Sequence, residues 1–236
     1  MLAWRIYADD YREWLISCLN GPPPNDPANP RVNWITGDLD FNGGNASNWD
    51  ITADITRSPL YSYHRNAAIY KCPADQSKVN VPGQGPKARV RSISMSQTFA
   101  FGEWLTGSYD QGGRGGPWAI FWKFPMIKNP SKTFVFIDEH PDSINDAAFA
   151  TSLTPNQPQM AAGHYVDYPA NFHNGGCTVS FSDGHCETHK WLGRFRTAPV
   201  KYDRSIPLNV TIPASDAASV RDCHWLAEWT SDFQKK

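Results

Sequence analysis

Apolar residues recur at helical spacing at both ends of the chain. Within residues 2–19 they follow one another at intervals of three and four, the repeat that lines one face of an α-helix. These positions are Trp4, Tyr7, Tyr11, Leu15 and Cys18. We therefore expect an amphipathic opening helix that ends at Gly21 and the prolines after it, since proline lacks an N–H and clashes with the preceding turn. Val220, Cys223 and Leu226 show the same spacing and predict a C-terminal helix around 217–229.

Between these helices the sequence favours β-strands and long irregular loops. Strand-like runs cover 89–101, 133–137, 177–181 and 185–191. Asn, Asp, Gly and Pro dominate residues 25–63, and glycine-rich loops are expected at 81–87 and 107–116. We find no internal repeat and no linker that divides the chain. The pattern predicts an α+β fold in one domain, 1–236, with the N-terminal helix on an antiparallel sheet.

Asp183-Gly184 predicts a β-hairpin between the last two strands. A two-residue type I′ turn needs positive φ at both central positions, and it would pair Phe181 with Cys186 and Ser180 with Glu187. Successive side chains of a strand point to opposite faces. The core face would then hold Cys177, Val179, Phe181, Cys186 and Thr188. The polar face would hold Thr178, Ser180, Ser182, His185, Glu187 and His189.

The composition of the chain limits the kinds of molecule that it is expected to bind. The chain has 236 residues, of which 40% are hydrophobic, enough for a sizeable core. The net charge of −1 shows no basic excess, so we expect no nucleic-acid partner. No apolar run reaches the roughly 18 residues that span a bilayer. The ten tryptophans have two interpretations, packing of loops and a surface that stacks on sugars.

The five cysteines are scattered along the chain: Cys18, Cys72, Cys177, Cys186 and Cys223. None lies in a CxxC pair, which disfavours a cysteine-rich structural zinc site. In an oxidising compartment up to two disulfides can form, and the sequence leaves their pairing open.

Several short motifs occur in a shared order. His173 is followed, after nine residues, by Asp183-Gly184. Other pieces are Tyr-Ala-Asp-Asp at 7–10, Tyr-Lys-Cys-Pro-Ala-Asp at 70–75, Arg-Ser-Ile-Ser-Met at 91–95, the acidic run at 138–146, and Trp-Leu-Ala-Glu-Trp at 225–229. Together they resemble the prepilin-processing-associated H-X9-DG family, whose members look like type II secretion pseudopilins.

The resemblance implies a pseudopilin-like head with a structural, assembly or cargo- and surface-binding role. Residues 1–20 would be the remainder of a long N-terminal helix whose membrane-spanning half precedes this sequence. The head would lie outside the cytoplasm, in the periplasm or at the cell surface, and the full-length protein would be anchored in the inner membrane. Its partners would be other pseudopilin or secretion subunits, or a secreted cargo. Only the missing helix would contact the membrane.

The acidic run after the strand 133–137 is the first candidate metal site. Its oxygen donors suit calcium, which takes six to eight of them, and the pseudopilin resemblance also implies calcium. They are Asp138, Glu139, Asp142, Asn145 and Asp146. A solvated, hydrogen-bonded loop without an ion is the alternative.

A transition metal is the second metal hypothesis. In this hypothesis His140, His173 or His185 joins the acidic run in binding the ion, and the sequence leaves open whether the run and the hairpin meet in space. His173 with Asp183, or His185 with Glu187, is within plausible reach on a hairpin, whereas His185 and His189 would lie roughly 13 Å apart on one strand, too far to share an ion. Asp183 and His173 also have a structural interpretation, in which they stabilise the turn and the loop.

An enzymatic role is the alternative to the structural one. Glycoside cleavage uses two carboxyl groups about 5 to 10 Å apart, and the candidates are Glu139, Asp138 and Asp183. Such a protein would be a secreted, polysaccharide-binding or polysaccharide-cleaving protein on the same scaffold, and as an enzyme it would be a hydrolase or a metal-dependent enzyme. No GxSxG, HExxH or GxxxxGK[ST] motif occurs, which disfavours serine-hydrolase, zincin and nucleotide-binding functions.

Overall fold

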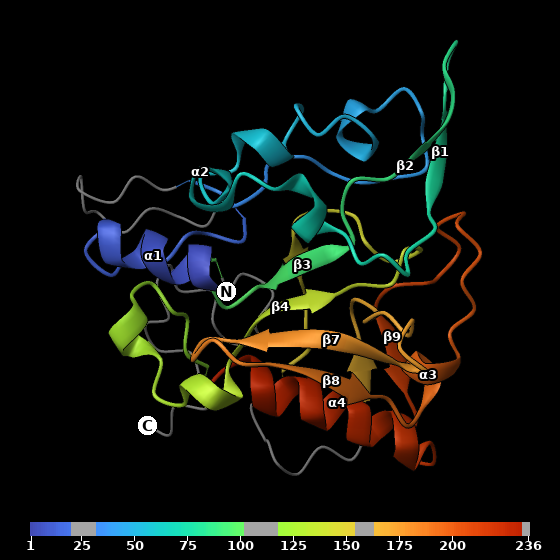
Figure 1. Cartoon of the computed structure of the whole chain (residues 1–236). Helices are drawn as coiled ribbons and strands as arrows, with labels where there is room; N and C mark the ends of the chain where they lie inside the picture. Colours follow the sequence, from blue (N-terminus) through green and yellow to red (C-terminus); the bar gives the residue numbers. More distant parts are fainter. Residues whose placement is uncertain (20–31, 102–117, 154–162, 233–236) are drawn as a thin grey trace.

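A central sheet lies between two helices from opposite ends of the chain (Figure 1). The computed structural model describes residues 1–19, 32–101, 118–153 and 163–232. Helix α1 spans Leu2–Asp10 and helix α4 spans Ala217–Thr230. The predicted α+β class is confirmed. The expected loop at 107–116 and the helix stop at Gly21 lie outside the described residues.

The central sheet has five strands in the order β5-β3-β4-β7-β8. Neighbours are antiparallel except β3 and β5, which are parallel. The strands are β3 (Ile93–Ser96), β4 (Phe134–Asp138), β5 (Ala148–Phe149), β7 (Gly176–Phe181) and β8 (Cys186–Lys190). The strand expected over 89–101 is therefore shorter than its apolar pattern, and only its central residues join the sheet.

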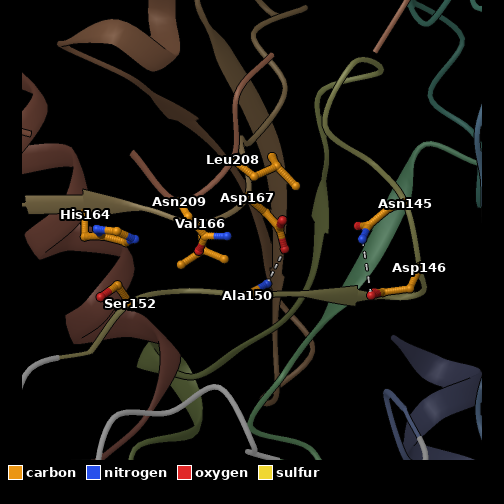
Figure 2. A pocket seen from close by; sticks show the side chains of 9 residues that line it. All are labelled: Asn145, Asp146, Ala150, Ser152, His164, Val166, Asp167, Leu208 and Asn209. Carbon is orange, nitrogen blue, oxygen red and sulfur yellow. Dashed lines mark hydrogen bonds between the residues drawn. The ribbon is translucent and has the colours of Figure 1, made fainter. Parts of the chain in front are cut away.

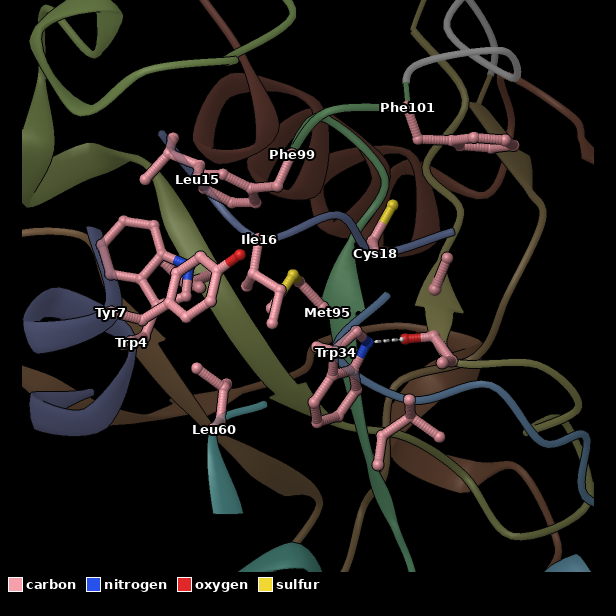
Figure 3. Close-up of a cluster of buried hydrophobic side chains, with 14 of the residues drawn as sticks. Trp4, Tyr7, Leu15, Ile16, Cys18, Trp34, Leu60, Met95, Phe99 and Phe101 are labelled. Carbon is pink, nitrogen blue, oxygen red and sulfur yellow. Dashed lines mark hydrogen bonds between the residues drawn. The ribbon is translucent and has the colours of Figure 1, made fainter. Parts of the chain in front are cut away.

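Two hydrophobic cores cover the two faces of this sheet. The first core joins Trp4 of α1 to Met95 of β3 (Figure 3). Val135 of β4 belongs to the same core. The second core joins Phe134 and Ile137 of β4 to the buried residues of β7 and α4. The β4–β7 ladder shifts register between Phe134 and Phe136, so that β4 carries one extra residue, Val135. This bulge allows Val135 and its neighbour Phe136 both to contact the first core.

Helix α1 is shorter than predicted, because the chain leaves the helix at Tyr11. Arg12 and Glu13 have φ values of 54° and 67°, outside the helical range. The segment that follows is extended and pairs with distant backbone: the amide of Leu15 donates to the carbonyl of Trp122, and that of Cys18 donates to Phe99. Tertiary pairing thus overrides the helical spacing of residues 11–19, and Leu15 and Cys18 are buried without being helical. The expected remainder of a long helix over 1–20 is wrong beyond Asp10.

Helix α4 confirms the predicted C-terminal helix. The carboxylate of Asp216 caps it by accepting a hydrogen bond from the amide of Ser219. Its apolar stripe of Val220, Cys223 and Leu226 is buried in the second core, and the helix runs beneath β7 and β8 in Figure 1.

The β7–β8 hairpin forms where predicted but in a different register. The amide of Phe181 donates to the carbonyl of His185, which leaves three residues, 182–184, in the turn. Ser180 therefore pairs with Cys186 and Val179 with Glu187. A shift of one residue exchanges the two faces of a strand. Glu187 and His189, expected on the polar face, share the face of the buried residues of β7, while Cys186 and Thr188 are exposed.

Smaller elements complete the fold. The expected glycine-rich loop at 81–87 is a hairpin of β1 (Lys78–Val81) and β2 (Gly85–Ala88), and β6 (Gly163–Tyr165) pairs with β9 (Val210–Ile212). Short helices are α2 (Tyr61–His64) and α3 (Arg194–Thr197), with 3-10 turns at Ala46–Asn48, Ile55–Arg57, Ala67–Tyr70, Phe124–Met126 and Pro130–Lys132. In the part of the chain that the structure describes, no helix is both long enough and apolar enough to span a membrane.

Candidate metal centre

Three potential metal ligands from distant segments meet at the C-terminal end of β4, the middle strand of the central sheet. The Sγ atom of Cys72 lies 3.5 Å from Nε2 of His173, and Oδ2 of Asp138 lies 3.7 Å from the same nitrogen. One ligand atom from each of the three residues lies within 4.8 Å of the other two. We refer to Cys72, Asp138 and His173 as the triad.

Cys72 follows the 3-10 turn Ala67–Tyr70 and begins a tight turn through Pro73. Its own amide donates to Oγ of Ser92 over 2.7 Å, which ties the turn to the start of β3. Burial raises the pKa of the Cys72 thiol, and hydrogen bonds from the backbone amides of Ala74 and Asp75 oppose that shift. Amide hydrogen bonds of this kind stabilise a thiolate, the form in which cysteine binds a metal.

Asp138 is the last residue of β4. Its side chain is 5% exposed, and Oδ2 accepts a hydrogen bond of 3.2 Å from the amide of Thr178 on β7. Burial raises the pKa of this carboxyl, while the Thr178 amide and then His173 lower it. The carboxylate is therefore held in one orientation by the sheet itself.

His173 stands in the loop that leads into β7. Its amide donates to the carbonyl of Gly176, and Asn174 and Gly175 adopt positive φ values of 55° and 81° to close this tight loop. The imidazole is 36% exposed. The loop thus places Nε2 over the buried donors and leaves part of the ring at the surface.

The triad combines a thiol, a carboxylate and an imidazole, the donors that zinc uses. With bonds of roughly 2.3 Å to sulfur and 2.0 Å to nitrogen, a tetrahedral ion separates the two donor atoms by about 3.5 Å. The Cys72–His173 separation of 3.5 Å matches this geometry. The residues present therefore fit a zinc-type ion.

The acidic run 138–146 does not converge on one point. Glu139 is fully buried and accepts hydrogen bonds from Oγ of Ser94 (2.6 Å) and Oγ of Ser143 (2.9 Å). Burial raises its pKa well above the usual range, and nearby Asp167 adds to the shift. The two hydroxyl groups provide hydrogen bonds for this buried carboxyl. They link the residue after β4 to Ser94 of β3 and to Ser143.

Asp142 and His140, two further residues of the acidic run, accept hydrogen bonds from backbone amides. Asp142 accepts hydrogen bonds from the amides of Lys201, Asp203 and Arg204. Nδ1 of His140 accepts from the amide of Asp142 over 3.2 Å. Burial lowers the pKa of His140. Asp142 therefore holds the run against residues 201–204, and His140 fixes the backbone at Asp142.

Asn145 and Asp146 line a separate pocket of about 420 Å³ (Figure 2). Asp167 enters the same pocket and accepts a hydrogen bond of 2.6 Å from the amide of Ala150. Burial raises the pKa of Asp146, and it raises that of Asp167 to about 7. Of the residues predicted to bind calcium, only Asn145 and Asp146 therefore face a cavity together. The other lining residues are Ala150, Ser152, His164, Val166, Leu208 and Asn209.

The structure does not bring His173 and Asp183 together. The six residues of β7 separate them, a length of roughly 20 Å. Asp183 lies in the exposed turn, where its carboxylate pairs with Nδ1 of His185 over 2.6 Å. His185 also stacks on Phe181 with ring centroids 4.3 Å apart. The two ends of the H-X9-DG motif therefore have different partners: Asp183 pairs with His185 in the turn, and His173 belongs to the triad.

The sequence indicated Asp138 and His173 as candidate ligands and left open whether the acidic run and the hairpin meet in one site. It did not indicate Cys72. The signal was present, since Cys72-Pro73 and His173 both belong to the motifs that carry the family resemblance. The chain matches no protein-family model, no curated protein and no solved structure.

Proposed function

We propose that this domain binds one transition-metal ion of the zinc type through Cys72, Asp138 and His173. The observation that carries the proposal is the mutual approach of three different donor atoms within 4.8 Å. All three donors come from different segments, so their meeting is a property of the fold and not of a local turn.

The donor set favours zinc over calcium. Calcium takes hard oxygen ligands, whereas a thiolate selects softer ions such as zinc or copper(I). With Cys72 and Asp138 ionised, the triad carries two negative charges, which a divalent ion neutralises. This neutralisation offsets part of the cost of keeping Asp138 ionised in a buried position.

Elemental analysis and calorimetric titration of the purified protein test the proposal. We expect one zinc per chain and loss of that ion in Cys72→Ser and in His173→Ala. Even an outer hydrogen-bond partner of a ligand is worth about 10- to 100-fold in metal affinity, so removal of a ligand should cost more. Cys186→Ser is the matched control, because Cys186 is an exposed thiol outside the triad.

Equal zinc binding by wild type and Cys72→Ser would contradict the proposal. Calcium is the ion expected for the acidic run, and a calcium titration of the same proteins addresses it separately. Calcium binding that survives Cys72→Ser and disappears in Asp146→Asn would assign a cation to the pocket of Asn145 and Asp146 instead.

The resemblance to the H-X9-DG family supports a structural role for the domain. In this role the domain is the extracytoplasmic head of a pilin-like protein, and the ion fixes the loops that its partners contact. Joined to a membrane-spanning N-terminal helix, the domain should insert into the inner membrane and assemble with itself or with other secretion subunits. A full-length protein that stays monomeric in membranes would count against this role.

Polysaccharide binding or cleavage is a second candidate, favoured by the pocket in Figure 2. Asp146 and Asp167 both line this pocket, and burial raises the pKa of both carboxyls. One carboxyl kept protonated beside another is the arrangement that glycoside cleavage uses. The three carboxyls named from the sequence have other surroundings: Asp138 belongs to the triad, Glu139 is buried with Ser94 and Ser143, and Asp183 lies in the exposed hairpin turn.

Release of reducing sugar from soluble polysaccharides tests this second candidate. Asp167→Asn should abolish the release and keep the fold, and Asp183→Asn, in the exposed hairpin turn, is its control. Activity that is absent from the wild type, or equal in both variants, would remove the candidate.

A further inference from the structure

We infer that a metal ion held by the triad keeps one coordination position for an exogenous ligand, water or a small anion, on the side of His173. The inference rests on the proposed function, and it makes the site an open, reactive centre and not a closed structural one. Three protein ligands with a fourth, exchangeable position are the arrangement of catalytic zinc sites, whereas structural sites have four protein ligands.

The number of donors is the first observation. Within residues 1–19, 32–101, 118–153 and 163–232, the triad is the only group of three or more metal-binding side chains with mutually close ligand atoms. Two carboxylates close to the triad in sequence are already engaged. Asp75 accepts hydrogen bonds from the amide and Oγ of Ser77 and pairs with Lys71. Glu139 accepts hydrogen bonds from Oγ of Ser94 and Oγ of Ser143. A tetrahedral ion therefore lacks a fourth ligand from this neighbourhood.

The second observation is the uneven exposure of the three donors. Cys72 is 7% exposed and the Asp138 side chain 5%, but the His173 side chain is 36% exposed. The two buried donors lie on the inner side of the ion and the histidine reaches it from the surface. The remaining tetrahedral position then faces outward, where solvent can enter.

Cys177 is the competing fourth ligand. It lies near the triad, since Asp138 and Cys72 both contribute to the raised pKa of its thiol, although burial is the main cause. Its side chain, however, is fully buried and belongs to the second core with Val179 and Trp191. Its sulfur is also not among the ligand atoms that lie within 4.8 Å of one another.

The charge of the site defines the class of ligand. A divalent ion with Cys72 thiolate, Asp138 carboxylate and neutral His173 forms a centre without net charge, which binds water or a single small anion in its open position. Zinc lowers the pKa of its bound water far below that of bulk water, and the two anionic ligands make this effect weaker here than in a site of three neutral histidines.

Cobalt substitution tests the inference. Co²⁺ replaces zinc in its sites and reports its ligands through visible d–d bands and a near-ultraviolet sulfur-to-cobalt charge-transfer band. We expect Co²⁺ to bind the wild-type protein with a charge-transfer intensity for one thiolate, and sodium azide to shift the visible bands in a saturable manner. Cys177→Ala and the more conservative Cys177→Ser should keep both properties.

A closed site gives a different result. If azide leaves the visible bands of the wild type unchanged, and the charge-transfer intensity falls by about half in Cys177→Ser, Cys177 is the fourth ligand and the inference is overturned while the metal site stands. An azide-insensitive spectrum that is the same in Cys177→Ser would also overturn it, because another group then fills the position. Failure of Co²⁺ and Zn²⁺ to bind at all would instead refute the proposed function.

Discussion

Asp167 is a carboxyl group buried in the wall of the pocket between β5 and β6, and burial decides its protonation. The pKa of this group is raised to about 7, mainly by desolvation; the Ala150 amide opposes the shift and Asp146 adds to it. Glu139, which is also buried, is electrostatically linked to Asp167. Near pH 7 Asp167 is therefore partly protonated, and its titration depends on the charge of Glu139.

Asp167 should make stability fall as the pH rises. The folded state holds the proton up to about pH 7, whereas an unfolded chain releases it near pH 4. The stabilisation is therefore fully present below about pH 4 and is lost as the pH approaches about 7. Asp167→Asn should remove this decline. It should raise the free energy of unfolding at pH 8 by a few kcal/mol at most, the free energy that corresponds to the difference between the folded and unfolded pKa values.

Urea unfolding from pH 4 to pH 8 measures this effect. Asp9→Asn, on the exposed face of α1, is the control, since the Asp9 side chain is 53% exposed. A parallel pH dependence of wild type and Asp167→Asn would show that another group carries it.

At the scale of elements, the β7–β8 hairpin shows how far the sequence predicts the fold. Asp183-Gly184 indicates the turn correctly, but the signal for a two-residue turn does not exclude a three-residue one. Gly184 has a φ of 102° and closes the longer turn. The difference of one residue moves His189 from the expected polar face to the buried face. There its ring stacks on that of Trp225, with the ring centroids 3.7 Å apart.

Gly184→Ala should weaken this hairpin without a steric clash. A Cβ atom at this position meets nothing within 4 Å, so the cost comes from the positive φ alone, roughly 1 to 2 kcal/mol. Gly44→Ala is a suitable comparison, because Gly44 has no positive φ and its Cβ would meet only the side chain of Asn42. Equal thermal melts of the two variants would show that the turn tolerates a side chain in this conformation.

His189 should make the hairpin sensitive to acid. Burial lowers the pKa of His189 to about 4, whereas an unfolded chain protonates histidine near pH 6.5. The stability contribution of neutral His189 is present above about pH 6.5 and is lost as the pH falls toward about 4. His189→Gln should reduce that loss, and Trp fluorescence during acid titration measures it; an unchanged midpoint would contradict the role of this histidine.

The prediction of the N-terminal helix is correct over Leu2–Asp10 and fails after Asp10 for a related reason. The spacing of Trp4, Tyr7, Leu15 and Cys18 satisfies a helix and is also compatible with an extended segment that is buried on all sides. Hydrogen bonds to Trp122 and Phe99 decide between them, and no local pattern encodes those partners. By contrast, α4 has its own cap at Asp216, so the sequence predicts it well.

At the scale of the whole molecule, the triad joins segments that lie far apart in the chain. The sequence points to Asp138 and His173 through their motifs. It cannot pair them with Cys72, because their approach depends on the packing of β3, β4 and the loop before β7. Residue type predicts which side chains can bind a metal, and tertiary structure decides which of them meet.

Removal of the ion should destabilise the entire domain. A ligand at 1,000 times its dissociation constant stabilises the native state by about 4 kcal/mol, and each kcal/mol shifts the melting temperature by roughly 2 to 4 °C for a chain of this size. We expect a chelator to lower the melting temperature of wild type and to have no effect on Cys72→Ser. Calorimetry with and without chelator measures the shift, and a chelator-insensitive wild type that contains zinc would contradict the expectation.

The separation of the three ligands along the chain also sets an order of events for biogenesis. The pairing of β4 with β7 and the packing of Cys72 against Ser92 bring the three ligands together, so an unfolded chain has no preformed place for the ion. Maturation would then proceed by folding first and metal loading second. The compartment in which the chain folds, with its own metal supply, would determine which ion the mature protein carries.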